Sequence, residues 1–385
     1  MKILILPSWY LPEGGEFCKE QAIHLKASGI NVNILANVEL SWKKYGFRAL
    51  TFPFGFKTCI EDGMLTNRHY SLRIPKSEKL NVQKWILSTL KQFDVYIKKY
   101  GKPDLIHAHS AMWAGYVAHL IKQKYGIPYV ITEHRGRFSE MAQPNSNTFK
   151  DWYSSYLHKA FSNADFIIPV SDLLIKKIRE FSGIDAKIQA ISNIVDTDFF
   201  HPETFKKGDV FTFFTANSYH DAKGYDVLLK AFDLVRNQAS DVKLVIAGEG
   251  FNNCDFQTYL SQCKNREFIT FTGFLEREEI RNHLWSADSY VLASRIEAQP
   301  ISVLEALSTG LPVVCTEVVP SEVLIPEAGY RAPVNDAVRL AKAMLEMINN
   351  HKSFDNEFIA DHARKLSSPQ HVINKLLKVY HSILG

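Results

Sequence analysis

Residues 295–305 read RIEAQPISVLE, with two glutamates eight positions apart on either side of a proline. Pro300 suits the first position of a helix, because its missing N–H group would have no partner there in any case. The stretch therefore predicts a helix over 300–309. At its start, the N–H groups of Ile301 and Ser302 and the positive end of the helix dipole would suit a diphosphate group.

The two glutamates stand on different sides of this predicted anion site. Glu305 lies five residues into the helix, and its side chain leans back toward the N-terminus. A carboxylate there can accept hydrogen bonds from both vicinal hydroxyls of a ribose. Glu297 precedes the helix, where a sugar on the far side of the diphosphate would lie. The alternative is that both are ordinary surface acids, which are common near helix starts.

Outward from this stretch, short apolar segments alternate with amphipathic helical patterns in both halves of the chain. This alternation predicts two α/β domains, each a doubly wound, Rossmann-like parallel sheet with helices on both faces. Ligands of such sheets bind at the carboxyl ends of the strands, so we expect the active site in a cleft between the two domains. The predicted strands are 2–6, 31–36, 104–109, 128–132, 166–170, 210–215, 243–247, 268–271, 289–292 and 312–315.

Length and composition indicate a globular protein of more than one domain. The chain has 385 residues, of which 46% are hydrophobic and 22% are charged. The first apolar run stops at Pro7, which favours a buried strand over a signal peptide or a membrane span. Five cysteines without a C-x-x-C pair predict reduced thiols, a cytoplasmic location and no metal knuckle.

The positive charge of the chain is concentrated in one window. Residues 41–100 hold 12 lysines and arginines against 4 aspartates and glutamates, interleaved with aromatic residues. This pattern suits peripheral contact with an anionic membrane, at the inner face of the cytoplasmic membrane, or a lipid-linked substrate. It suits equally a loop and a helix whose aromatics pack inward while the lysines are solvated. Nucleic acid is disfavoured, because the excess is confined to one patch.

The segment SRIEAQPISVLEALSTGLPVV, residues 294–314, resembles the E-x7-E signature of the retaining glycosyltransferases of family 4 (GT4, glycosyl transferases group 1). That family has two Rossmann-like domains facing a cleft, the GT-B fold. Ala298 and Pro300 depart from the family pattern, which has glycine at both places. Residues 16–22 (EFCKEQA) resemble a branch that acts on surface polysaccharides.

A second resemblance lies in residues 215–229, TANSYHDAKGYDVLL. The family pattern G-R-x4-K-G-x-D-x-L-L implies that Lys223 stabilises the charge that develops on the donor diphosphate. Ser218 stands where the family has an arginine. Tyr219, His220, or Arg135 and Arg137 could supply the missing contact; otherwise the site is weaker.

The resemblance also assigns weaker motifs to the site. Gly14 and Gly15 follow the first strand and would let backbone approach the donor. His134 would lie over the donor sugar, with His109 and Arg135 on the acceptor side. The implied catalytic residues are His134, Glu297 and Lys223. The implied donor-binding residues are Gly14, Gly15, Ser218, Lys223, Gly248, Gly273, Phe274, Ile301, Ser302 and Glu305.

No metal or other cofactor is expected. Asp196-Thr197-Asp198 spells a D-x-D, but it falls in the connection between the domains, where a turn or helix-cap role is favoured. The expected domains are 1–196 for the acceptor, a connection at 197–208, and 209–365 for the nucleotide sugar. The resemblance further implies that a final helix within 366–385 packs back on the first domain.

The expected function is transfer of a hexose from a nucleoside-diphosphate sugar to a hydroxyl of a glycan or a lipid-linked acceptor, with retention of configuration. Two alternatives remain open at this point. One is a sugar-nucleotide epimerase of the same architecture, which needs no acceptor. The other is a catalytically silent binder of sugar nucleotides, which the serine at position 218 suggests.

Overall fold

The computed structural model describes residues 1–139, 151–204 and 208–385. The chain divides into two compact units. Unit 1 contains residues 1–138, the described part of 144–194, and Val372–Gly385, whereas unit 2 extends over Val195–His371 and includes Ser139. Residues 205–207 of the predicted connection lie outside the described residues.

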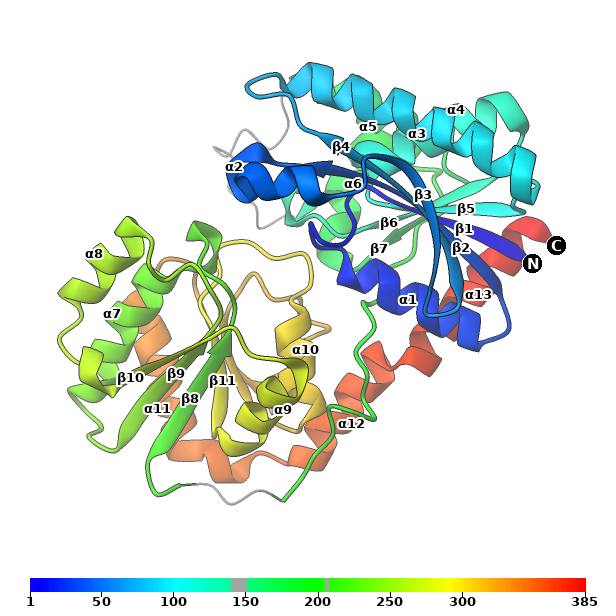
Figure 1. Ribbon diagram of the computed structural model, residues 1–385. Helices are drawn as coiled ribbons and strands as arrows, with labels where there is room; N and C mark the ends of the chain where they lie inside the picture. Colours follow the sequence, from blue (N-terminus) through cyan, green and yellow to red (C-terminus); the bar gives the residue numbers. More distant parts are fainter. Residues whose placement is uncertain (140–150, 205–207) are drawn as a thin grey trace. The chain divides into compact units, whose positions relative to one another are not determined.

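Unit 1 is built on a sheet that, within the described residues, has the strand order β3-β4-β2-β1-β5-β6-β7 (Figure 1). All neighbouring strands are parallel except β3, which pairs antiparallel with β4 at the edge. The strands are β1 (Lys2–Pro7), β2 (Asn31–Leu40), β3 (Gly55–Glu61), β4 (Met64–Leu72), β5 (Leu105–His109), β6 (Tyr129–Glu133) and β7 (Phe166–Pro169).

Helices cover both faces of this sheet. Buried side chains of α1 (Glu16–Ala27) and α13 (Pro369–Leu384) share one apolar core with Ile3 and Ile5 of β1. On the other face lie α3, α4 and α5 (Figure 1). The further helices of unit 1 are α2 (Trp42–Tyr45), the 3-10 helix η1 (Gly46–Thr51), α3 (Glu78–Tyr100), α4 (Tyr116–Tyr125), α5 (Asp151–Ser162) and α6 (Ile175–Ser182).

Unit 2 has an all-parallel sheet with the order β10-β9-β8-β11-β12-β13 among the described residues. Phe213 of β8 packs into a core with α7, α8 and α11, and its neighbour Phe214 packs into a core with α9, α10 and α12. The strands are β8 (Phe211–Ala216), β9 (Val242–Ala247), β10 (Ile269–Gly273), β11 (Ser289–Leu292), β12 (Val313–Thr316) and β13 (Gly329–Ala332). The helices are α7 (Tyr225–Arg236), α8 (Cys254–Gln262), α9 (Arg277–Ser286), α10 (Ile301–Ser308), α11 (Ala337–Asn350) and α12 (Asn356–Ser367).

The prediction of two Rossmann-like α/β domains is confirmed, and each of the ten predicted strands corresponds to an observed strand. Three further strands were not predicted: the hairpin of β3 and β4, and β13. Strand β3 adds an antiparallel edge to the otherwise parallel sheet of unit 1, because the two-residue turn at Asp62-Gly63 reverses the chain.

Candidate functional site

In unit 2, the loops that follow β8 and β11 bring two predicted site residues together. These strands are neighbours in the sheet, so both loops leave the same edge. The ammonium group of Lys223 lies 2.8 Å from Oε1 of Glu297. Ser294 Oγ donates a hydrogen bond of 2.7 Å to the same oxygen. The Glu297 side chain is only 12% exposed, so these two donors hold the carboxylate in one place.

Helix α10 follows this carboxylate directly. Pro300 is the residue before the first helical turn, not its first member as predicted, because its backbone is extended (ψ 112°) while its carbonyl accepts from the N–H groups of Val303 and Leu304. Ile301 and Ser302 are therefore the first two helical residues. Their N–H groups are among those that a helix leaves without an intrahelical acceptor. Glu305 lies one turn further on and is half-buried.

Arg295, in the loop after β11, contacts the loop that carries Lys223. The guanidinium Nη2 of Arg295 bonds both carboxylate oxygens of Asp226 at 2.7 Å, and its backbone N–H donates to Ala222 O at 2.7 Å. Gly224 approaches the same strand end so closely that a Cβ atom there would lie 2.1 Å from the Ala293 carbonyl oxygen. Through these contacts, Arg295 fastens the loop that carries Lys223 to the loop after β11.

Tyr290, which the sequence motifs did not indicate, contacts the loop after β8. The Tyr290 hydroxyl is buried in β11 and accepts from Ala216 N (3.2 Å) and Asn217 Nδ2 (3.0 Å). Burial raises the pKa of Tyr290, so the hydroxyl stays protonated and can donate as well as accept. A tyrosine within an apolar strand carries no sequence signal that separates this role from core packing.

The remaining predicted donor residues surround the same strand ends. Ser218 Oγ accepts from Glu249 N at 3.2 Å, which ties together the loops after β8 and β9. Gly248 donates its N–H to Gly273 O at 2.8 Å, linking β9 to the end of β10. Phe274 follows β10 and is 64% exposed. These residues form one continuous edge of unit 2.

In unit 1, the carboxyl ends of β5 and β6 bring the predicted histidines together. His109 Nδ1 lies 3.0 Å from His134 Nε2, and the two rings stack. His107 is buried beside them and bonds Tyr380 OH and Thr132 Oγ1, each at 2.6 Å. Burial lowers the pKa of His109 to about 3 and lowers the pKa of His134 well below its ordinary value. Both imidazoles are therefore neutral near pH 7 and act as hydrogen-bonding groups.

A buried glutamate positions this edge. Glu133 is fully buried, and its Oε1 accepts from Ser110 Oγ (2.6 Å) and from the N–H groups of His134 and Arg135 (3.0 Å each). Its other oxygen accepts from Ala111 N at 2.9 Å. The sequence reasoning passed over Glu133, although an acid between a strand end and a site histidine was the signal available.

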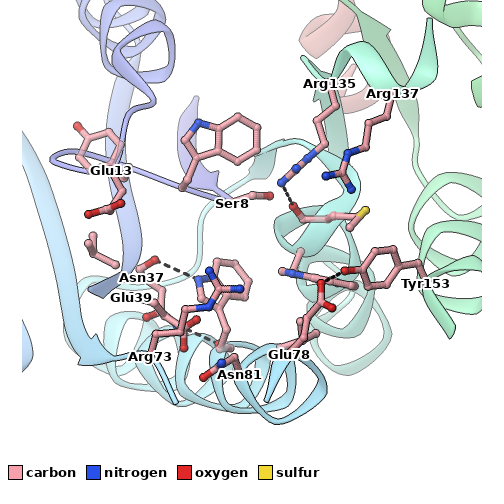
Figure 2. Close-up of a pocket in the computed structure, with 17 residues that line it drawn as sticks. Ser8, Glu13, Asn37, Glu39, Arg73, Glu78, Asn81, Arg135, Arg137 and Tyr153 are labelled. Atoms are coloured by element: carbon pink, nitrogen blue, oxygen red, sulfur yellow. Dashed lines mark hydrogen bonds between the residues drawn. The ribbon is translucent and has the colours of Figure 1, made fainter. Parts of the chain in front are cut away.

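A polar cavity of about 530 Å³ opens in unit 1 beside these residues (Figure 2). Arg135 and Arg137 line one side, and Arg73 lines the opposite side near Glu39 and Asn81. The Arg135 guanidinium lies 4.6 Å from the centre of the Trp9 ring and donates to Met112 O at 3.1 Å. The cavity combines three arginines and three glutamates with indole and phenol rings, so its lining is polar and carries both signs of charge.

The two predicted glycines stand next to this cavity. Gly14 and Gly15 follow the first strand with φ of 90° and 93°, and Gly15 is the residue from which α1 starts. Trp9 and Phe17, on either side of this turn, have ring centroids 5.8 Å apart. Phe17 also lies 4.0 Å from the His134 ring. The glycine turn thus brings aromatic rings against the site histidine.

The D-x-D stretch forms a turn. Asp196 Oδ1 accepts from Phe199 N at 3.0 Å, and the Asp196 carbonyl accepts from Phe200 N. Within the described residues, no group of three or more histidine, cysteine, aspartate or glutamate side chains could hold a metal ion. In the same part of the chain, no helix has the length and apolarity needed to cross a membrane.

Comparison with known proteins gives matches over both halves. Residues 209–350 match the family model described as glycosyl transferases group 1, and residues 16–199 match that of glycosyltransferase family 4. The protein named putative teichuronic acid biosynthesis glycosyltransferase TuaC, from Bacillus subtilis (strain 168), is 25% identical over 345 residues. That alignment covers 83% of this chain and 81% of TuaC.

Solved structures show the same fold. Sucrose-phosphate synthase from Thermosynechococcus elongatus matches with a TM-score of 0.82 at 17% identity, covering 100% of this chain and 99% of that one. Anabaena HepE, solved in complex with UDP, matches with a TM-score of 0.73 at 16% identity over 100% of both chains.

Proposed function

Because this chain belongs to the group 1, family 4 glycosyltransferases, we propose that it transfers a hexose from a nucleoside-diphosphate sugar to a hydroxyl of a glycan or lipid-linked acceptor, with retention of configuration. The name of TuaC assigns that relative to teichuronic acid biosynthesis, which supports a role in making a surface polysaccharide or glycolipid. HepE was solved with UDP, which supports a nucleotide-sugar donor.

The observation that carries the proposal is the ion pair of Lys223 and Glu297 directly before α10. In the proposed complex, the amides of Ile301 and Ser302 bind the diphosphate. The Lys223 side chain leaves Glu297 and contacts the oxygens of the diphosphate. Glu297 then accepts from hydroxyls of the sugar, and Glu305 from those of the ribose. The pair leaves both charges matched before the donor arrives, so neither is buried alone.

The proposed reaction needs no protein base. The bond between the anomeric carbon and the phosphate oxygen breaks, and the acceptor oxygen bonds the same face of that carbon. The acceptor proton passes to the oxygen of the leaving phosphate. Lys223 and the first amides of α10 stabilise the charge on that phosphate.

The test compares Glu297→Gln with Glu357→Gln, a matched change at an exposed glutamate of α12 in the same unit. We expect UDP or GDP to raise the melting temperature of both variants and of the wild type, because a ligand that binds only the native state stabilises it. Transfer from the matching sugar nucleotide should fall about 100-fold or more in Glu297→Gln alone.

Three outcomes would contradict the proposal. One is that no nucleoside diphosphate stabilises the protein. Another is that Glu297→Gln transfers sugar as fast as the wild type. The third is that the enzyme converts its donor to an epimer without any acceptor.

We also propose peripheral contact with an anionic membrane, at the inner face of the cytoplasmic membrane, through the segment of α2 and η1. Trp42, Phe47 and Leu50 are 42%, 83% and 55% exposed there, and this segment also carries Lys43, Lys44 and Arg48. Exposed apolar side chains among cations are the composition of an interfacial segment.

Sedimentation with anionic liposomes tests this contact. We expect the wild type to sediment with them at low salt and to be released as salt screens the charges. Phe47→Ser should lose most of the bound fraction, whereas Ile184→Ser, at an equally exposed apolar residue (83%) of unit 1, should not. If the wild type stays in the supernatant at low salt, there is no such contact.

A further inference from the structure

Two cavities adjoin on unit 1. The polar cavity of about 530 Å³ shares Arg73, Glu78 and Asn81 with a second cavity of about 630 Å³. The second cavity lies between Trp42 at the start of α2 and the turn that joins β4 to α3. Trp42 and Lys43 of the proposed membrane-contact segment line this second cavity.

A third hollow, of about 510 Å³, continues along α3 and shares Ile74 with the second. Its apolar lining is exposed: Ile74 is 41%, Leu80 53% and Leu87 66% exposed. Lys84 and Lys91 flank this lining. Leu80 and Leu87 are two turns apart on the helix, which is roughly 10 Å. Large apolar side chains gathered on one exposed face indicate a binding surface.

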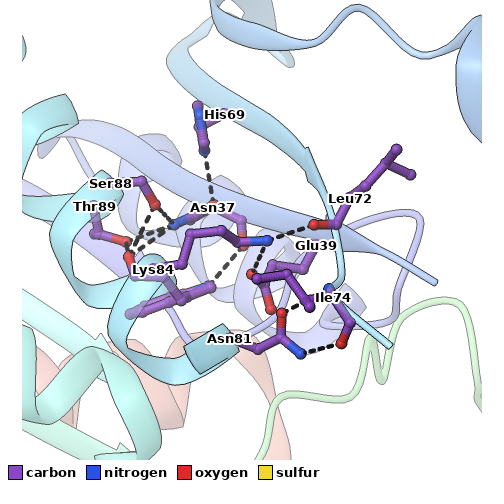
Figure 3. Close-up of polar contacts among 10 residues, drawn as sticks. Asn37, Glu39, His69, Leu72, Ile74, Asn81, Lys84, Ser88 and Thr89 are labelled. Carbon is purple, nitrogen blue, oxygen red and sulfur yellow. Dashed lines mark hydrogen bonds and ion pairs between the residues drawn. The ribbon is translucent and has the colours of Figure 1, made fainter. Parts of the chain in front are cut away.

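The junction between the polar and apolar hollows is held rigidly (Figure 3). Asn81 accepts from Ile74 N at 2.8 Å and donates to Ile74 O at 2.7 Å. Lys84 donates to Leu72 O and pairs with Glu39 at 2.9 Å. These contacts fasten the turn after β4 to α3, so the shape of the junction exists before any ligand binds, which reduces the entropy lost on binding.

Positive charge dominates the lining of the three hollows. Seven lysines and arginines line them against three glutamates in the described residues. Glu39 is paired with Lys84, and Glu78 accepts from Tyr153 OH. Arg73 lines the first and the second cavity and is exposed to solvent. It precedes Ile74, the first residue of the exposed apolar lining of the third hollow. An anionic group attached to an apolar chain would match this order of cation and apolar surface.

We propose that these three hollows form the acceptor site and that the acceptor is an amphiphile: a sugar joined through a diphosphate to an apolar chain. The sugar lies in the polar cavity, the diphosphate lies at Arg73, and the first part of the chain lies along Ile74, Leu80 and Leu87. This inference rests on the proposed function, of which it specifies the acceptor.

Binding of farnesyl diphosphate tests the proposal without requiring turnover. Trp42 and Trp85 line the hollows, so tryptophan fluorescence reports occupancy. Titrations are made with and without saturating UDP and GDP, which occupy the donor site. We expect farnesyl diphosphate to bind at least about tenfold more tightly than farnesol, inorganic diphosphate or a short-chain phosphatidylglycerol below its micelle concentration. Its affinity should be the same with nucleotide present.

Variants on the same surface locate the site. Arg73→Gln and Leu87→Gln should each raise the Kd for farnesyl diphosphate about tenfold. Lys98→Gln and Val95→Gln are matched changes at exposed positions of α3 outside the hollows and should change it less than about twofold. All four residues are exposed, so the fold is retained, and an unchanged melting temperature checks this.

The inference is overturned if inorganic diphosphate or phosphatidylglycerol binds as tightly as farnesyl diphosphate, if nucleotide displaces the probe, or if the control variants weaken binding equally. It is also overturned if the enzyme transfers sugar to soluble glycans while farnesyl diphosphate does not bind, an outcome that leaves the proposed function intact. Specific probe binding with neither nucleotide binding nor transfer would instead contradict the proposed function, and the three hollows would then be a binding site for an amphiphilic diphosphate without a role as acceptor site.

Discussion

At the scale of single residues, Gly224 and Gly273 form a natural pair, because both have a positive φ (+64° and +75°) in different surroundings. A Cβ atom at Gly224 would lie 2.1 Å from Ala293 O, whereas at Gly273 it would meet no heavy atom of the described residues within 4 Å. We expect Gly273→Ala to lower the free energy of unfolding by about 1–2 kcal/mol, the strain of left-handed backbone.

Gly224→Ala should lower the unfolding free energy by about 2 kcal/mol more than Gly273→Ala, because the backbone at Ala293 has to move as well. Both glycines belong to unit 2, so urea unfolding of that unit measures both losses in the same transition. Equal losses in the two variants would mean that the contact with Ala293 is without consequence.

Single residues of the candidate site could be predicted from the sequence, but not their contacts. The motifs indicated Lys223 and Glu297 separately, but their ion pair joins residues 74 positions apart and depends on β8 lying beside β11. Tyr290 was missed because the groups that bond its hydroxyl lie at the end of another strand, β8. For Glu133, the position next to His134 was a signal in the sequence, but its contacts with the residues after β5 depend on the fold. Whether the predicted residues bind donor and acceptor stays a prediction.

At the scale of elements, the basic window 41–100 differed most from expectation. One of the two interpretations of this window predicts a loop and a helix, but the window also contains the hairpin of β3 and β4. The signal was present in Asp62-Gly63, a dipeptide that favours the tight turns of hairpins. In β3, most side chains are exposed, so the alternation of apolar and polar residues that identifies a half-buried strand is weak.

Pro300 illustrates why the start of an element is harder to predict than its existence. A proline has nearly the same φ in an extended segment as in a helix, so sequence alone does not decide which side of the boundary it occupies. In the structure ψ is 112°, and helix α10 starts one residue later. The predicted use of the Ile301 and Ser302 amides is unchanged by this shift.

At the scale of the whole chain, both ends belong to unit 1, with β1 near the start and most of α13 at the end. Leu376 and Tyr380 of α13 are fully buried in the core that contains Ile3 and Ile5. The hydrogen bond of Tyr380 OH to His107 connects this helix with the buried histidines at the ends of β5 and β6. The stability of unit 1 therefore depends on groups that change charge with pH.

The direction of that dependence follows from the pKa values. Burial lowers the pKa of His109 to about 3, and that of the unfolded chain is about 6.5. Between these values the unfolded chain binds more protons than the folded one, so the histidine contributes its full stability above about pH 6.5 and loses it as the pH falls. For one such histidine, the unfolding free energy falls by at most about 1.4 kcal/mol per pH unit.

We therefore expect the unfolding free energy of unit 1, measured in urea between about pH 7.5 and pH 4.5, to fall steeply below pH 6.5 or so. His109→Gln should flatten this acid limb, because the side chain that must be protonated on unfolding is gone, while His381→Gln, at an exposed position of α13, should leave the slope unchanged. Parallel curves for His109→Gln and the wild type would mean that His109 takes up its proton at the same pH in the folded protein as in the unfolded chain. In that case the imidazole next to His134 would become charged below about pH 6.5, and the neutral hydrogen-bonding role assigned to this edge of unit 1 would hold only at higher pH.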